Sequence, residues 1–451
     1  MIETEAYQLG ELCTLVSRGI TPRYTENIEN SCIILNQRCI RDYQINSDNA
    51  RMHDLSKRRI STDKILKTFD VLVNSTGVGT LGRVAQYLST KNQMISVDSH
   101  VTIIRPNIQK IDALYFGYLI KSKQSIIENL GQGSTGQTEL SKEAIKELSV
   151  LVIKDKNIQN NISNFLLNID NKITLNTQTN QTLEQIAQAI FKHWFIDFAP
   201  VHAKANALAR GETTEQAELA AMACLSGKTA EKITALKAQD PTAYQQLQQT
   251  AQAFPSEFVE TEMGQVPKGW EVLKFKDFVK ETKEKVGKLQ GIEEYSVGNE
   301  GIYPRKEKYK KQLAKDPSKN KLIREANIVF GMGNKEVNWG IMRDKIGSVS
   351  SAYNIFQIND INHLFLDMFI NNIPYYFRDI IKPTSRQGQT IDKEAFLEKA
   401  IYYPNKEIIN IFLEKITQIN ELSICIKSQN IYLLSIRDYL LPKLLGGEIK
   451  L

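Results

Sequence analysis

Three patterns in the sequence have residue types that could carry out chemistry, and the first is rich in glycine. Gly77, Gly79 and Gly82 match the G-x-G-x-x-G spacing that binds dinucleotides, and Asp98 follows at a distance suited to a ribose carboxylate. That fingerprint also requires a helix that starts at the third glycine. Residues 83–88 instead have the composition of a strand that returns from a hairpin. The glycines therefore predict a tight turn, where the backbone can closely approach a phosphate or a base.

The second pattern is Asn372-Ile373-Pro374-Tyr375, which resembles the Asn-x-Pro-aromatic site of amino-methyltransferases. Such a site holds a flipped base and orients the target amine. The enzyme would also need a strand, a glycine loop and an acidic residue for S-adenosylmethionine, and Val329–Gly333 lacks both the carboxylate and the following helix. The alternative is a proline turn that packs Tyr375, Tyr376 and Phe377 into the core.

The third pattern concerns histidine and cysteine, and it predicts neither a metal site nor a catalytic nucleophile. The histidines have no carboxylate or cysteine at ligand spacing, and the cysteines are odd in number and without a C-x-x-C pair. This cysteine usage is typical of a reducing cytoplasm. The residues are His53, His100, His193, His202 and His363, with Cys13, Cys32, Cys39, Cys224 and Cys425.

Length and composition are those of a multidomain globular chain. The 451 residues exceed one core and suggest about three or four units, and 42% of them are hydrophobic. No run approaches the roughly 18 apolar residues that cross a bilayer, and the acidic N-terminus is unlike a signal peptide. We expect a cytoplasmic protein without a membrane partner.

Two helices at matching positions organise the chain. Asn160–Phe198 predicts one long helix with a seam at heptad spacing, and adding 250 to each position gives a second seam near the C-terminus. Asn176 and Asn180 interrupt the first seam, and Asn430 with Gln429 would satisfy their amides if the helices pair antiparallel. The seam positions are Ile162, Leu166, Ile169, Ile173, Asn176, Asn180, Leu183, Ala187, Ile190 and Trp194, then Phe412, Ile416, Ile419, Ser423, Ile426, Asn430, Leu433, Arg437, Leu440 and Leu444.

Each long helix follows a segment with a mixed strand and helix pattern. The first contains predicted strands at Cys32–Leu35, Asp70–Asn74, Arg83–Tyr87, His100–Arg105 and Leu148–Ile153, a helix at Ala113–Lys123 and a helix capped by Ser141. In the second, Ala326–Phe330 matches Asp70–Asn74, and residues 388–395 echo residues 136–144. The offset is 389 − 137 = 252 at the glutamine and 394 − 143 = 251 at the glutamate, so we infer a duplication with small deletions.

These patterns predict an α+β protein in which two α/β domains form a pseudo-twofold tandem repeat, separated by an antiparallel coiled coil of two long helices. Between the repeats lies an alanine-rich, helix-favouring and acidic connector. The expected bounds are 1–154 for the first domain, 155–199 for its helix, 200–262 for the connector, 263–404 for the second domain and 405–451 for its helix.

Charge and amide content indicate a nucleic-acid partner. From Arg305 to Arg324, nine lysines and arginines stand against Glu307 and Asp316, which suits a polyphosphate backbone, although a solvated loop has the same composition. Arginine and glutamine also read base edges. The candidate DNA-binding residues are Arg18, Arg23, Gln37, Arg38, Arg41, Ser75, Thr76, Arg83, Gln132, Thr135, Gln137, Arg305, Lys306, Lys308, Tyr309, Lys310, Asn334, Lys335, Arg386, Gln387 and Gln389.

The order of these features resembles the DNA-specificity subunit of type I restriction-modification systems, over essentially the whole chain. The motifs are the hairpin Asp70–Gly77 with Gly82–Val84, the helix end Gln188–Phe198, the re-entry Gly264–Val272 and the tail Leu440–Ile449. The first domain departs from the pattern because it lacks the Gly-Trp-Glu opening found at residues 269–271, which leaves its N-terminal edge undefined. The turn at residues 330–333 also differs from its counterpart in the first domain, so the two turns should read different bases.

The resemblance implies two target-recognition domains, two methyltransferase subunits docked on the helices, and restriction subunits that join them. S-adenosylmethionine, ATP and magnesium would be used by these partners, so this chain would be non-catalytic within a type I site-specific deoxyribonuclease. Each domain would read a short half-site in the major groove of double-stranded DNA. The end residues Trp194, Phe195, Leu444 and Leu445 would face a recognition domain or a methyltransferase subunit.

Two alternatives remain. A stand-alone DNA amino-methyltransferase would methylate DNA without another subunit, but the sequence lacks its cofactor loop. A coiled-coil scaffold that does not bind DNA is the other, and it need not show salt-sensitive binding to duplex DNA.

Overall fold

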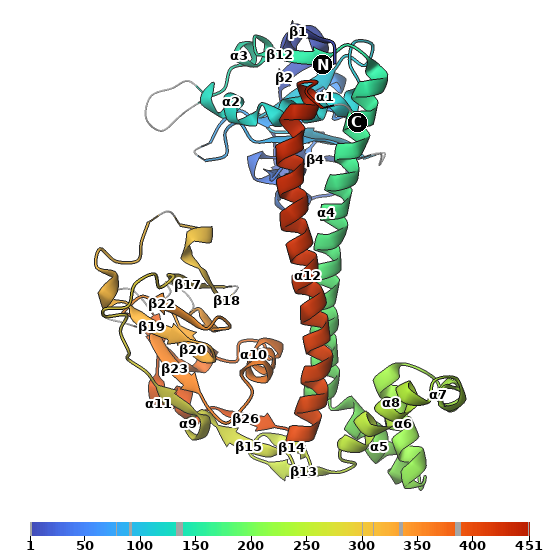
Figure 1. Ribbon diagram of the computed structural model, residues 1–451, viewed down its shortest axis with the longest axis vertical. Helices are drawn as coiled ribbons and strands as arrows, with labels where there is room; N and C mark the ends of the chain where they lie inside the picture. Colours follow the sequence, from blue (N-terminus) through green and yellow to red (C-terminus); the bar gives the residue numbers. More distant parts are fainter. Residues whose placement is uncertain are drawn as a thin grey trace. The chain divides into compact units, whose positions relative to one another are not determined.

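The computed structural model divides into two compact units, Met1–Asn180 with Cys425–Leu451, and Gln181–Ile424. It describes residues 2–77, 79–89, 93–131, 139–299, 301–309, 311–332, 337–383, 389–449 and 451. Each unit holds one α/β domain and one stretch of each long helix (Figure 1). These helices are α4 (Lys156–Phe191) and α12 (Lys406–Leu445).

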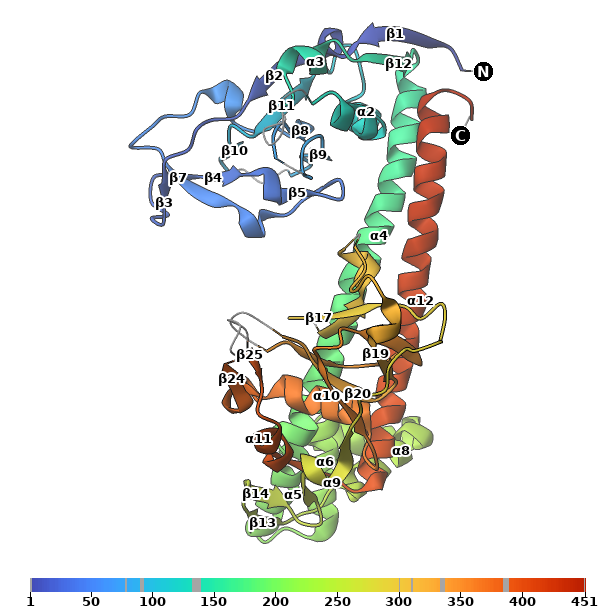
Figure 2. The same ribbon diagram turned by 90° about the vertical axis from the view of Figure 1, so that its left-hand side faces the viewer.

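The first domain contains two four-stranded sheets. One is antiparallel throughout and has the order β2-β11-β8-β9. The other has the order β10-β4-β7-β3, with β10 parallel to β4 (Figure 2). The strands are β2 (Cys13–Arg18), β3 (Tyr24–Thr25), β4 (Ser31–Leu35), β7 (Arg51–Asp54), β8 (Val71–Asn74), β9 (Val84–Gln86), β10 (Ile95–Val97) and β11 (Val101–Pro106).

A terminal pair of strands closes the first domain. β1 (Thr4–Gln8) pairs antiparallel with β12 (Ser149–Ile153), so the N-terminal edge that the sequence left undefined lies at β1. A short hairpin, β5 (Ile40–Arg41) with β6 (Gln44–Ile45), adjoins the sheet.

The strand β8 lies at the centre of the first core. Its residues alternate between two hydrophobic clusters, with Val71 and Val73 in one and Leu72 in the other, so both of its faces are covered. This explains why its sequence is continuously apolar. The helix α1 (Ala113–Ser122) packs Phe116 and Leu119 against the first of these clusters. The shorter helices are α2 (Gln124–Asn129) and α3 (Lys142–Lys146).

The second domain repeats the main sheet and the terminal strand pair of the first. Among the described residues, its other strands form two-stranded pairs rather than a second four-stranded sheet. Its main sheet has the order β16-β23-β20-β21 and is also antiparallel, and β15 pairs with β26 as β1 pairs with β12. The helix α10 (His363–Asn372) follows the sheet as α1 does. The strands are β15 (Glu271–Lys274), β16 (Val279–Glu281), β20 (Asn327–Phe330), β21 (Trp339–Ile341), β23 (Asn354–Ile358) and β26 (Ala400–Tyr403).

The remaining elements of the second unit fall outside this sheet. The strands are β13 (Phe258–Thr261), β14 (Gly264–Pro267), β17 (Tyr295–Gly298), β18 (Gly301–Pro304), β19 (Lys321–Arg324), β22 (Ile346–Val349), β24 (Ile381–Pro383) and β25 (Gln389–Ile391). The helices are α9 (Phe275–Phe278) and α11 (Lys393–Glu398). The connector forms four helices, α5 (Ala199–Ala209), α6 (Thr214–Ser226), α7 (Ala230–Gln239) and α8 (Pro241–Ala253).

Strand registers measure the duplication. In the terminal pairs, Thr4 faces Ile153 and Glu271 faces Tyr403. The offset between repeats is therefore 271 − 4 = 267 at the first strand and 403 − 153 = 250 at the last. The second domain has lost residues relative to the first, as the drift in the sequence predicted.

In the first unit α4 and α12 pair antiparallel through a seam with a polar centre. Asn176 Nδ2 donates to Asn430 Oδ1 over 2.9 Å and lies 3.4 Å from Gln429 Oε1. Towards the C-terminus of α12, Leu444 and Leu445 pack with Ile162 and with α1, so they face the first domain. Of the described residues, none provides a partner for the buried Oδ1 of Asn180.

In the second unit the end of α4 differs from the prediction. The α-helix starts at Lys156 rather than Asn160, ends at Phe191, and continues as one turn of π-helix over Lys192–Ile196. Phe198 then adopts a left-handed φ of 47°, and a proline occupies the first turn of α5, so the helix cannot continue to Phe198.

Aromatic side chains surround this helix end. The rings of Phe191, Trp194 and Phe195 lie 5.0 to 6.0 Å from the ring of Phe412 on α12. Phe195 also contacts Trp270, centre to centre 5.9 Å. The seam therefore ends in the core of the second domain.

Candidate nucleic-acid interface

A polar cluster lies beyond the end of β8 in the first domain. Arg18, at the end of β2, forms an ion pair with Glu139 and donates from Nη2 to the main-chain oxygen of Leu140 over 2.8 Å. Both acceptors follow residues 132–138 directly in the chain. The candidates Gln132, Thr135 and Gln137 fall in that stretch and lie outside the described residues.

Two residues of the turn after β8 form side-chain hydrogen bonds, one in the core and one at the surface. Ser75 is fully buried, and its Oγ lies 2.5 Å from Thr102 Oγ1, so this candidate supports the turn without reaching solvent. Thr76 is half-buried, and its Oγ1 lies 2.7 Å from Nδ1 of the exposed His100. The turn thus presents a hydroxyl and an imidazole together, a donor and acceptor set that can bind a base edge or a phosphate.

Gln37 and Arg83 adjoin the glycine turn. Asn74 Nδ2, at the end of β8, donates to the main-chain oxygen of Gln37 over 3.0 Å, and Arg83 donates to the main-chain oxygen of Gly79 over 2.9 Å. Gly77 has a φ of 102°, and a Cβ atom there would lie 2.5 Å from Gln37 Oε1. The hairpin pairing of β8 with β9 excludes the helix of a dinucleotide site, so the glycines form the predicted turn.

The remaining candidates of the first domain are exposed arginines in separate segments. Arg38 follows Asn36, which caps its short 3₁₀ turn, and Arg41 pairs with the neighbouring Asp42 at 3.4 Å. Arg23 lies across from His53, which is fully buried and accepts at Nδ1 from the Arg23 main-chain nitrogen over 2.8 Å. These three arginines are therefore held by segments other than those that hold Arg18 and the turn after β8.

In the second domain, arginine and lysine stack on tyrosine. The Arg305 guanidinium lies 4.5 Å from the Tyr309 ring centre, and Lys308 Nζ lies 4.3 Å from that of Tyr303. Arg305 also donates to Ser296 Oγ over 3.0 Å. Burial, together with a hydrogen bond to Tyr309, raises the pKa of Tyr303, so the Tyr303 ring remains a neutral hydrogen-bonding group near neutral pH. Stacked cations of this kind suit both phosphate and base contacts.

The other candidates of the second domain are less grouped. Lys306 pairs with Glu293 at 2.6 Å, and Gln389 begins β25 with its Oε1 buried and without a partner among the described side chains. Lys310, Asn334, Lys335, Arg386 and Gln387 lie outside the described residues.

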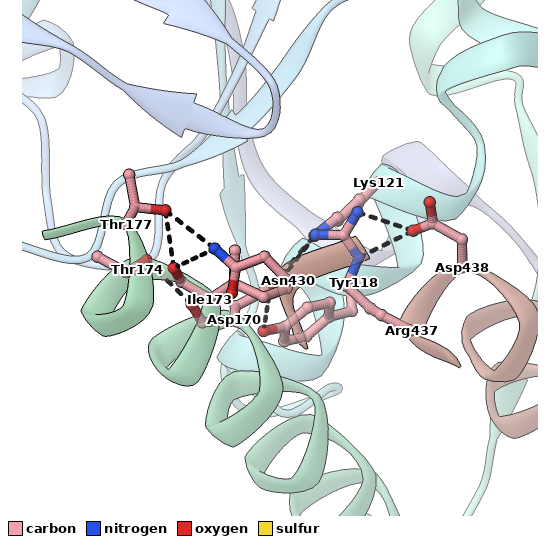
Figure 3. Close-up of polar contacts among 9 residues, drawn as sticks. All are labelled: Tyr118, Lys121, Asp170, Ile173, Thr174, Thr177, Asn430, Arg437 and Asp438. Atoms are coloured by element: carbon pink, nitrogen blue, oxygen red, sulfur yellow. Dashed lines mark hydrogen bonds and ion pairs between the residues drawn. The ribbon is translucent and has the colours of Figure 1, made fainter. Parts of the chain in front are cut away.

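A buried charged cluster joins the first domain to both long helices. Asp170 of α4 accepts from Tyr118 over 2.9 Å, Lys121 over 3.2 Å and Arg437 of α12 over 2.9 Å (Figure 3). Burial disfavours the Asp170 carboxylate, but Lys121 and Arg437 more than offset this, and the net pKa lies below its usual value of 3.8. Burial also lowers the pKa of Lys121, an effect that Asp170 opposes.

The seam residues occupy the positions that the heptads assign. Buried members are Ile162, Ile169, Asn176, Phe412 and Ile426, and half-buried members are Leu183, Ile190, Ile419, Leu433 and Leu440.

The methyltransferase-like motif has a structural explanation. Asn372 ends α10, and its amide donates to Gln188 Oε1 and to the main-chain oxygen of Met368. The expected packing of three aromatic rings is wrong for Tyr375, which is 76% exposed because its φ of 57° turns the chain, whereas Phe377 is buried.

The sequence predicts that His193 has no cysteine or carboxylate at ligand spacing. In the folded chain, however, a cysteine distant in the sequence lies beside it. The His193 Nε2 lies 3.3 Å from Cys224 Sγ. Within the described ranges, no group of three or more histidine, cysteine, aspartate or glutamate side chains could hold a metal ion. In the same ranges no helix is long and apolar enough to cross a membrane.

Two residues that organise the site were not predicted from the sequence. His100 precedes a buried strand by one residue and faces the glycine turn, and a polar residue at a strand start opposite a candidate loop was the available signal. No local signal marked Asp170, because its partners come from segments distant in the sequence.

Comparison with known proteins identifies the family. A model of the type I restriction modification DNA specificity domain matches residues 1–185. The chain is 30% identical over 473 residues to the type I restriction enzyme HindI specificity subunit of Haemophilus influenzae, with all of both chains covered. It is 24% identical over 386 residues to the MjaIX specificity subunit of Methanocaldococcus jannaschii, covering 80% of this chain and 74% of that one.

A solved structure shows the same fold. It is the crystal structure of the type I restriction-modification system S subunit from M. genitalium, with a TM-score of 0.50 and 14% identity, and the match covers 98% of this chain and 96% of that one. Together with the full-length identity of 30%, which carries the assignment, this places the chain in the family of type I restriction enzyme specificity subunits.

Proposed function

We propose that the chain reads a split, asymmetric DNA target, with one half-site for each α/β domain. The observation that carries this proposal is the duplication of one topology with different side chains at the same place. The turn after β8 bears Thr76 beside His100, whereas the turn after β20 begins with Gly331 and Met332. Because base edges are read by side-chain donors, acceptors and apolar groups, unlike turns select unlike bases.

The long helices would set the distance between the half-sites. From Phe412 to Leu440, both in the α12 seam, there are 440 − 412 = 28 residues. At 1.5 Å per residue this is about 42 Å of helix. It corresponds to roughly 12 base pairs of DNA at 3.4 Å per step. The bases between the half-sites would not be read.

We assign catalysis to partner subunits. On this proposal two methyltransferase subunits bind S-adenosylmethionine, restriction subunits use ATP and magnesium, and this chain supplies no catalytic residue. The support is that Asn372 is engaged with Gln188 and Met368, while Val329 belongs to a strand that returns directly as a hairpin. Asn372 therefore lacks a free amide for a flipped base, and Val329 lacks the setting of a methyltransferase cofactor loop.

An apolar face of α12 is the proposed docking surface for a methyltransferase subunit. Ile431, Tyr432 and Tyr439 are 67%, 70% and 61% exposed. Exposed apolar groups at this density on one helix are typical of interaction sites. The equivalent positions on α4, 250 residues earlier, are Gln181, Thr182 and Ala189, so the two helices present unlike faces.

Methylation mapping tests the proposed function. Host DNA is sequenced for modified bases with and without the gene, and the expected result is one bipartite motif that disappears with the gene. A contiguous motif, or an unchanged pattern in a host that carries the partner subunits, would contradict the proposal.

Two further measurements separate the alternatives. Methylation by the purified chain with S-adenosylmethionine and no other subunit would indicate a stand-alone enzyme. Duplex binding that does not weaken steeply with salt would indicate a scaffold, because phosphate contacts release counterions.

A further inference from the structure

The turn between β5 and β6 holds a tyrosine in an unfavourable conformation. Asp42 and Tyr43 have φ values of 51° and 61°, which are those of a two-residue hairpin turn that favours asparagine and glycine. A bulky aromatic residue rarely adopts a left-handed φ, and such strain persists where surrounding contacts determine it. The contacts of the Tyr43 side chain therefore show what holds the turn in this conformation.

The Tyr43 ring rests on the charged cluster of Figure 3. Its centre lies 4.5 Å from Lys121 Nζ and 5.7 Å from the Arg437 guanidinium. Lys121 is 8% exposed and Arg437 is 6% exposed, and both are held by Asp170. Cations that are fixed and desolvated in this way attract an aromatic face more strongly than cations in water. Tyr43 therefore packs the hairpin against Lys121 of α1 and Arg437 of α12, and Asp170 of α4 binds both of these residues.

The segment that leads into this turn carries candidate DNA contacts. Arg41 is exposed, whereas the adjacent Ile40 is fully buried under the sheet. Gln37 begins the 3₁₀ turn that leads into β5, and its main chain is bonded to Asn74 beside the glycine turn. The Gln37–Arg41 segment is therefore held by Asn74 at its start and by the Tyr43 turn at its end.

We propose that Tyr43 is a positioning residue that fixes the Gln37–Arg41 segment against the long helices and so determines how strictly the first half-site is read. This inference rests on the proposed DNA-reading function. Tyr43 itself contacts no base. It acts through the orientation of the segment that does.

The second domain offers a matched control. Tyr375 also has a left-handed φ, 57°, and also lies beside an arginine, with the Arg378 guanidinium 5.7 Å from its ring centre. Its ring is 76% exposed. In that domain Asn372 and Gln188 form a neutral amide contact between α10 and α4. Tyr375→Gly thus makes the same chemical change at a similar backbone conformation without removing a buried contact.

The experiment compares methylation fidelity in cells that express the full chain with its partner subunits. The variants are Tyr43→Gly, Tyr43→Phe and Tyr375→Gly, and the readout is the methylated fraction at the full target and at sites with one mismatched base. Glycine suits the turn, so Tyr43→Gly should still methylate the full target. Mismatched sites in one half of the motif should be methylated about five-fold more often. A change of about five-fold corresponds to the free energy of one lost cation–π contact. Tyr43→Phe and Tyr375→Gly should match the wild type.

Several outcomes would overturn the inference. These are unchanged fidelity in Tyr43→Gly, equal relaxation of both half-sites, or relaxation in Tyr43→Phe, which keeps the ring. If Tyr43→Gly also loses methylation of the full target, Tyr43→Leu decides, because it retains apolar bulk without attraction for cations, and it should relax the same half-site. Failure of the proposed function is distinguishable, since the wild-type chain would then give no bipartite motif.

Discussion

At the residue scale, Asp170 is the group whose loss should be felt most in the first unit. Asp170→Asn would leave Lys121 close to Arg437 without the carboxylate between them, although Arg437 would keep its ion pair with Asp438. Breaking a buried pair by removing one partner costs about 3 kcal/mol. We expect this loss in local stability at α1 and α4, measured as faster hydrogen exchange of their amides in the full chain.

The pH dependence of the same variant follows from the Asp170 pKa. A carboxyl group whose pKa is lower in the folded chain stabilises it above the unfolded value and loses that contribution as pH falls through the folded value. The difference between wild type and Asp170→Asn should therefore be constant near neutral pH and shrink below pH 3.8, the usual pKa of this carboxyl. Asn372→Ala is the control in the other domain, and it should cost less than about 1 kcal/mol. Equal protection in wild type and Asp170→Asn would show that the cluster adds no stability.

At the element scale, the polar centre of the helix seam allows a second test. Asn176 is 3% exposed and bonds to Asn430, which also lies 3.3 Å from Thr177 Oγ1. Asn176→Leu alone would leave Asn430 Oδ1 without the donor that it has in the wild type and should cost about 1–2 kcal/mol. Replacing both asparagines with leucine should recover most of this loss, because no polar group stays unpaired. Local hydrogen exchange at the centre of α4 measures both, and a double variant less stable than the single one would contradict the argument.

Heptad spacing explains why the seam was predictable and its flanks were not. Seam positions recur at fixed intervals, so the sequence alone located Asn176 and its counterpart Asn430. Arg437 also occupies a seam position, but its partner Asp170 lies beside the seam and is shared with Lys121 of α1. Such a contact depends on how a helix packs across the pair, which periodicity does not encode. The turn residues Tyr43 and Tyr375 show the same limit, because similar backbone angles leave one ring packed on cations and the other exposed.

At the scale of the whole molecule, the tandem repeat predicts how the two domains correspond, whereas the separate candidate residues do not predict which side chains lie together. The drift in offset along the sequence matches the strand registers, since the main sheet and the terminal pair have the same strand order in both domains while the second domain is shorter. Loop side chains are free to differ without disturbing that order. The repeat was therefore predictable from sequence, whereas the order of the strands, and the grouping of Arg18 with Glu139 or of Arg305 with Tyr309, required the folded chain.

The length of the helix pair should set the distance between the half-sites. Inserting one heptad into both α4 and α12, at matched seam positions, should lengthen the pair by seven residues, about 10 Å of helix. The motif methylated by the partner subunits should keep both half-sites while its spacer grows by roughly three base pairs. Inserting the heptad into α12 alone serves as the control, and it should abolish methylation because the seam would no longer pair. An unchanged spacer in the double insertion would show that the helices do not set the distance, and the half-sites would then have to be placed by the partner subunits instead.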